Sequence, residues 1–176
     1  MSETASPLQP TYPLTPYQLG FFDLLSHFNW THAVHLAYSY ERISERQLRL
    51  HLVEWSKFCQ PILGGHFDWA VFEEVKNGFQ HFHGLLLSES TKDQLLLASM
   101  WDRDASSVET FMELGWKWSI GGQNPAGNPH RLMVERIKPE SGGIAGSLGY
   151  ALKDFSEHRF YVLGNGIERV LTASRT

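Results

Sequence analysis

Two histidines one residue apart, His81 and His83, are the side chains whose types and spacing most clearly suggest chemistry. Because alternate side chains of a strand point to the same side, a strand here would direct both imidazoles toward one ion. Glu73 and Glu74 lie upstream, across the hairpin dipeptide Asn77-Gly78. A three-residue loop would place Glu73 opposite His81, and a two-residue turn would place Glu74 there. Two imidazoles and one carboxylate suit a divalent cation that keeps open positions for substrate.

A tyrosine and a lysine, Tyr150 and Lys153, stand three residues apart in a segment, 141–155, that we expect to be helical. On a helix these two side chains share a face. A tyrosine near a cation and a metal-polarised phosphate can act as a nucleophile that becomes covalently attached. His32 and His35 fall in a predicted strand at opposite parity, so they cannot both join one site, and at least one is expected to be structural.

The elements that must position these side chains predict an α+β fold. A capping-box pattern at Ser44 to Gln47 begins a helix that runs to about residue 58, and Asn77-Gly78 joins two apolar runs as a hairpin. Strands are expected at 30–40, 66–75, 79–87, 116–120 and 131–137, and further helices at 91–101 and 105–115. Strands joined by hairpins, with helices between them, favour a sheet covered on one face.

Composition sets outer limits on the function. The 176 residues suffice for one domain, and four prolines among the first 16 predict a flexible tail over 1–16, with the domain at 17–176. One cysteine excludes a disulfide framework. The net charge of −4 gives no overall basic character, but residues 114–153 hold five bases against two acids, so a basic face stays possible. No apolar span or leader is recognisable, so we expect an intracellular protein without a membrane partner.

The motifs, taken in order, resemble a known family. His81-Phe82-His83-Gly84-Leu85-Leu86 follows Phe72-Glu73-Glu74 and Gly78, and Tyr150-Ala-Leu-Lys153 ends a glycine-containing helix. This order is similar to the single-tyrosine rolling-circle replication initiators (Rep proteins) of the HUH endonuclease superfamily, over roughly residues 28 to 155. The first strand departs from the family's Thr-Leu-Thr type of pattern, so it is assigned no catalytic role. No Gly-x-x-x-x-Gly-Lys loop follows, so unwinding is expected to come from a host helicase.

The resemblance implies a central antiparallel sheet of about five strands, with helices packed on one face and the site on the other. It implies a sequence-specific nickase and strand-transferase for single-stranded DNA at a replication origin, which leaves a 5′-phosphotyrosine and a 3′-OH for a host polymerase. His81, His83 and Glu73 would hold Mg²⁺ or Mn²⁺; Glu73 is chosen over Glu74 because its offset from His81 looks like the family's. Tyr150 would be the nucleophile, and Lys153 would stabilise phosphate charge.

Other expectations stay open beside this one. Candidate DNA contacts, by stacking or by charge, are Trp116, Lys117, Trp118 and Arg131. The location would be the cytoplasm of a bacterial or archaeal host, or the host nucleus for a eukaryotic virus. Alternatives are an HUH transposase of the same chemistry, a cupin-type oxygenase, for which the spacing around the His-x-His pair fits poorly, and a non-catalytic single-stranded nucleic-acid-binding module.

Overall fold

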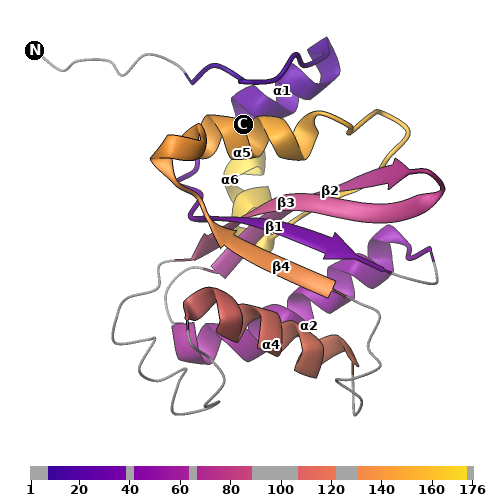
Figure 1. Ribbon diagram of the computed structural model, residues 1–176, viewed down its shortest axis with the longest axis vertical. Coiled ribbons are helices and arrows are strands. Elements are labelled where there is room, and N and C mark those ends of the chain that lie inside the picture. Colours follow the sequence, from indigo (N-terminus) through magenta and orange to yellow (C-terminus); the bar gives the residue numbers. More distant parts are fainter. Residues whose placement is uncertain (1–7, 39–41, 64–66, 89–106, 122–130, 174–176) are drawn as a thin grey trace, which may run out of the picture.

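The computed structural model describes residues 8–38, 42–63, 67–88, 107–121 and 131–173. Its helices are α1 (Pro16–Leu25), α2 (Glu45–Leu63), α4 (Val108–Gly121), α5 (Gly143–Leu152) and α6 (Asn165–Ala173), with a short 3₁₀ turn at Pro139–Ser141. Its strands are β1 (His32–Ala37), β2 (Phe67–Lys76), β3 (Phe79–Ser88), β4 (Arg131–Arg136) and β5 (Tyr161–Leu163). They form one antiparallel sheet in the order β4-β1-β3-β2-β5 (Figure 1).

Helices lie against both faces of the sheet. In Figure 1, α2 and α4 lie below it, whereas α1 and α5 lie above it. Each face has its own apolar core: Val71 and Phe82 pack with α2 and α4, and Phe72 and Leu85 pack with α1, α5 and α6. The α+β class and the five-stranded antiparallel sheet are therefore confirmed, but the helices are not confined to one face. The reason is that the central strands carry apolar residues at both parities, so both faces must be covered.

The hairpin predicted from Asn77-Gly78 between β2 and β3 is confirmed, and of the two turn lengths left open it has the two-residue turn. Asn77 has φ 53° and Gly78 has φ 81°, the left-handed conformations that Asn-Gly adopts in tight hairpins. Lys76 therefore pairs with Phe79, and the register continues through Glu74 opposite His81. The predicted cap of α2 is also present, since the Gln47 backbone N–H donates to the Ser44 hydroxyl and the Gln47 side chain accepts from the Ser44 backbone.

The segment expected as a strand at 116–120 is instead the second half of α4. Phe111, Met112 and Trp116 recur at helical spacing, and all three are fully buried against α2. Trp116 meets the Trp55 ring edge-on at 5.7 Å between centroids. Aromatic residues favour strands in general, but here the packing of one helical face determines the structure. The helix expected at 91–101 lies outside the described residues.

The tail predicted over 1–16 does not hold for residues 8–16. The Thr15 hydroxyl accepts from the Gln18 backbone and the Gln18 side chain accepts in return, so Thr15 and Pro16 begin α1. Tyr12 packs edge-on against Tyr150 at 5.9 Å between ring centroids. Pro16 therefore marks the start of a helix, and α1, β5 and α6 were all missed from the sequence. Within the described chain, no helix is both long and apolar enough to cross a membrane.

Candidate functional site

The β2–β3 hairpin brings one glutamate and two histidines to the same face of the sheet. The two-residue turn pairs Glu74 with His81, and the Glu74 Oε2 lies 2.6 Å from His83 Nε2. Both side chains of this contact are about nine-tenths buried, at 10% and 12% exposure. Glu74, rather than Glu73, is therefore the carboxylate beside the His-x-His pair.

Glu73 points to the opposite face, and its prediction as a metal ligand is wrong. Its carboxylate accepts a hydrogen bond from Gln80 Nε2 at 2.7 Å and a longer one from the Phe160 backbone at 3.4 Å. Gln80 in turn donates to the Ile43 carbonyl and accepts from its N–H. The physical reason is the register: one residue of shift moves a strand side chain to the other side of the sheet.

His35, on the interior strand β1, joins the same cluster although the sequence assigned this strand no role. It pairs directly with His83, and the two imidazoles stack with their centroids 4.5 Å apart. The His35 and His81 rings are 5.8 Å apart. Among the described residues, His35 Nε2 and His81 Nδ1 are buried without a hydrogen-bond partner. The sequence signal was present, because His35 has the parity of the site face, but only the pairing of β1 with β3 gives it meaning.

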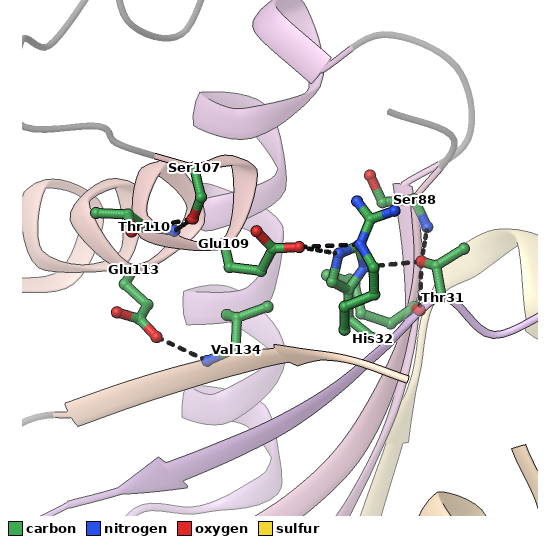
Figure 2. Close-up of polar contacts among 10 residues, drawn as sticks. Thr31, His32, Ser88, Ser107, Glu109, Thr110, Glu113 and Val134 are labelled. Atoms are coloured by element: carbon green, nitrogen blue, oxygen red, sulfur yellow. Dashed lines mark hydrogen bonds and ion pairs between the residues drawn. The ribbon is translucent and has the colours of Figure 1, made fainter. Parts of the chain in front are cut away.

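His32, by contrast, is structural, as the parity argument allowed. It is fully buried, and Figure 2 shows its two ring nitrogens in contact with the Thr31 hydroxyl at 2.8 Å and the Glu109 carboxylate at 3.1 Å. Glu109 also accepts from Arg136 at 3.2 Å, and Glu113 accepts from the Val134 backbone at 2.9 Å. These contacts tie α4 to β1 and β4 on the face away from the candidate site.

Helix α5 places Tyr150 over the histidines. Leu148 and Leu152 are fully buried beneath the helix, which leaves the Tyr150 ring on its margin with 42% of its surface exposed. This ring stands edge-on to His83, at 5.1 Å and 88° between planes. Lys153 Nζ lies 3.7 Å from the centroid of the Tyr150 ring, so the expected shared helical face is observed.

Burial dominates the electrostatics of this cluster. It lowers the pKa of His83 to about 4, with His35 and Lys153 adding to the effect, and it also lowers the pKa of His35. Burial raises the pKa of Glu74, and the carboxyl of Asp154 beside it raises that pKa further. The His83 imidazole is therefore neutral near pH 7, and its Nε2 lies beside the Glu74 carboxyl group. Asp154, which lies two residues past the end of α5, was missed from the sequence.

The donor types of this cluster fit a divalent cation. Imidazole nitrogens and carboxylate oxygens are common ligands of such ions. Two of the imidazole nitrogens, His35 Nε2 and His81 Nδ1, are buried and have no hydrogen-bond partner among the residues that the structure describes. In the described part of the chain, however, no three histidine, cysteine, aspartate or glutamate side chains already surround one point. A cation held by His81, His83 and Glu74 would therefore require these side chains to rotate and the contact between His83 Nε2 and Glu74 Oε2 to break.

Three of the four predicted DNA contacts do not lie at this site. Trp116 is fully buried in the core, so it cannot stack on a base. Lys117 and Trp118 lie on α4, which covers the opposite face of the sheet. Arg131 is different: it begins β4 opposite Ala37, and its neighbour Leu132 packs into the α2/α4 core, so Arg131 faces the side of the histidines.

The free protein is expected to lose stability as the pH falls from 7 to 5. Folding lowers the pKa of His83 from its ordinary value of 6.5 to about 4. Between these two pH values the unfolded chain binds a proton at His83 and the folded chain does not, so protonation favours the unfolded state. His83 alone should cost about 1–2 kcal/mol at pH 5. Urea unfolding at the two pH values, in EDTA, checks this. The His83→Gln variant should show a smaller loss, and an equal loss in both proteins would contradict the assignment.

The chain was compared with protein-family models, curated proteins and solved structures. No family model, curated protein or solved structure matches this chain. The geometry of one cluster of side chains is therefore what indicates a function, and we call this cluster the histidine–tyrosine site: His35, His81, His83, Glu74, Tyr150, Lys153 and Asp154.

Proposed function

We propose that this chain is a metal-dependent nickase and strand-transferase for single-stranded DNA that starts rolling-circle replication through a 5′-phosphotyrosine. The observation that carries the proposal is the meeting of Tyr150 and Lys153 with the His83 and Glu74 pair from the β2–β3 hairpin. These groups come from segments about 70 residues apart in the chain, and they supply a nucleophile, a cation and metal-binding donors.

The chemistry is a transesterification at phosphorus. The Tyr150 hydroxyl oxygen attacks the scissile phosphorus, the bond from phosphorus to the 3′ oxygen breaks, and the phenol proton leaves as the new ester forms. The leaving 3′ oxygen takes up a proton, so the products are a 5′-phosphotyrosine and a free 3′-OH that could prime a polymerase. A bound Mg²⁺ or Mn²⁺ would supply positive charge to a non-bridging phosphate oxygen.

The chain's own residues have distinct roles in this proposal. His81, His83 and Glu74 would hold the cation, and Lys153, above the Tyr150 ring, would stabilise negative charge that develops on the phosphate. His35 is the candidate to receive the phenol proton, because its lowered pKa keeps it neutral near pH 7 and its Nε2 has no partner among the described residues. A transposase would use the same arrangement on a different DNA end.

The test is the formation of a covalent complex. The protein is incubated with a pool of random single-stranded DNA and Mn²⁺, separated in SDS, and examined by mass spectrometry for a nucleotide on the peptide that contains Tyr150. We expect an adduct that is lost on removing the metal with EDTA and restored by adding Mn²⁺ in excess. DNA binding without any adduct, with Mn²⁺ bound, would favour the non-catalytic binding module instead.

A further inference from the structure

A pocket of about 360 Å³ adjoins Tyr150 on the site face of β1 and β4. In Figure 1 these two strands lie below α5. Its lining includes Tyr12, His35, Met133, Glu135, Ser147 and Tyr150. Leu132 and Val134 pack into the opposite core, so alternation along β4 turns Met133 and Glu135 toward this pocket. The pocket therefore extends from the nucleophile to the edge strand of the sheet.

The walls of this pocket suit a flat ring. Tyr12 and Tyr150 meet edge-on and keep 37% and 42% of their surfaces exposed, and Met133 is 51% exposed. Exposed aromatic rings and a polarizable thioether are the surfaces on which nucleobases stack. Ala33 lies opposite Glu135 on β1, so the neighbouring side chain on this face is small and leaves room beside the carboxylate.

Glu135 is the one acidic side chain among the described residues that line this pocket, and it favours hydrogen-bond donors. A glutamate carboxylate only accepts hydrogen bonds, and its charge disfavours a phosphate in the same place. Of the four DNA bases, guanine alone presents an imino and an amino hydrogen side by side, which matches the two oxygens of one carboxylate. Cytosine and adenine offer a single amino group next to an acceptor, and thymine offers a single imino hydrogen between two acceptors.

From this geometry we infer that the pocket binds one guanine base of the single-stranded substrate, with Glu135 accepting from its N1–H and N2–H groups. The inference rests on the proposed function, and it names the base that the site reads. Because Tyr150 lines the same pocket, the guanine would be a close neighbour of the scissile phosphate in sequence. Arg131, two strand positions beyond Met133 on the same face, is placed to contact the backbone of the same strand.

The experiment measures binding and needs no turnover. The Tyr150→Phe protein, in EDTA, selects tight binders from a random single-stranded DNA pool, and the same selection is run with Glu135→Gln added. Fluorescence anisotropy then compares the best oligonucleotide with versions that carry adenine or inosine at the preferred guanine. Inosine lacks only the N2 amino group, so it removes one of the two hydrogen bonds. Glu140→Gln, a nearby exposed carboxylate on the 3₁₀ turn, is the matched control.

We expect one position of the selected sequences to be guanine, and adenine there to weaken binding by about 5- to 100-fold. The inosine penalty should shrink in Glu135→Gln and persist in Glu140→Gln. Selected sequences without such a guanine, or an inosine penalty that survives Glu135→Gln, would overturn the inference while a Tyr150 adduct in the earlier assay would still support the nickase. Failure to bind any single-stranded DNA, together with no adduct, would overturn both.

Discussion

The Tyr150→Phe variant is expected to form the covalent DNA adduct at least about 1,000-fold more slowly than the original protein, because it lacks the only atom of this side chain that can attack phosphorus. The ring itself remains, with its edge-on contact to His83 and the Lys153 charge above it. Free energies of unfolding should therefore agree within about 0.5 kcal/mol. The measurement is the rate of adduct formation on the oligonucleotide found in the pool experiment.

Tyr161 provides the matched control for this variant. It lies on β5 and is 38% exposed, close to the 42% of Tyr150, but its ring packs against Phe21 rather than a histidine. Tyr161→Phe should leave the adduct rate within a factor of about two. An adduct that survives in Tyr150→Phe and disappears in Tyr161→Phe would show that the nucleophile has been misassigned.

The second large expected effect is that substituting Glu74 and substituting its neighbour Glu73 change metal binding and stability in opposite ways. Glu74→Gln should weaken Mn²⁺ binding by more than about 100-fold, because even residues that only support a metal ligand cost 10- to 100-fold when changed. Replacing the Glu74 carboxylate by an amide removes a buried charge beside Asp154, so the metal-free protein should not become much less stable. Calorimetric titration with Mn²⁺ measures the first effect and urea unfolding the second.

Glu73→Gln should behave in the opposite way. Its carboxylate is 7% exposed and accepts from Gln80 on the far face, so an amide there would lose a charged hydrogen bond and cost about 1–3 kcal/mol of stability. Mn²⁺ affinity should stay within about threefold. If Glu73→Gln abolished metal binding while Glu74→Gln left it intact, the hairpin register would have to differ from the one described.

Local sequence predicted much of the framework around the histidine–tyrosine site. Asn77-Gly78 predicted the hairpin because few dipeptides adopt two adjacent left-handed conformations, and the Ser44 capping box predicted where α2 begins. Period-two alternation predicted that His81 and His83 share a face, and helical spacing predicted the same of Tyr150 and Lys153. Each of these features depends on residues only a few positions apart.

Other features required contacts between distant segments. The prediction ended a helix at residue 115 and began a strand at 116, whereas α4 continues to Gly121. The reason is that the burial of Trp116 against Trp55 outweighs the local preference for a strand. Residues 8–16 were taken for a tail, since nothing in their composition reveals that Tyr12 packs on Tyr150. These errors arise because packing partners far away in sequence decide the conformation.

The sequence shows which groups are available: two same-face histidines, two candidate glutamates, and a tyrosine with a lysine one turn away. Which of these groups meet depends on the fold. The turn length, which sets the strand register, turned Glu74 inward and Glu73 away. The pairing of β1 with β3 brought His35 onto His83, and the docking of α5 brought Tyr150 and Asp154 to them. A residue's type determines the chemistry that its side chain can perform. The register, the strand pairing and the helix packing determine which other side chains lie close enough to take part.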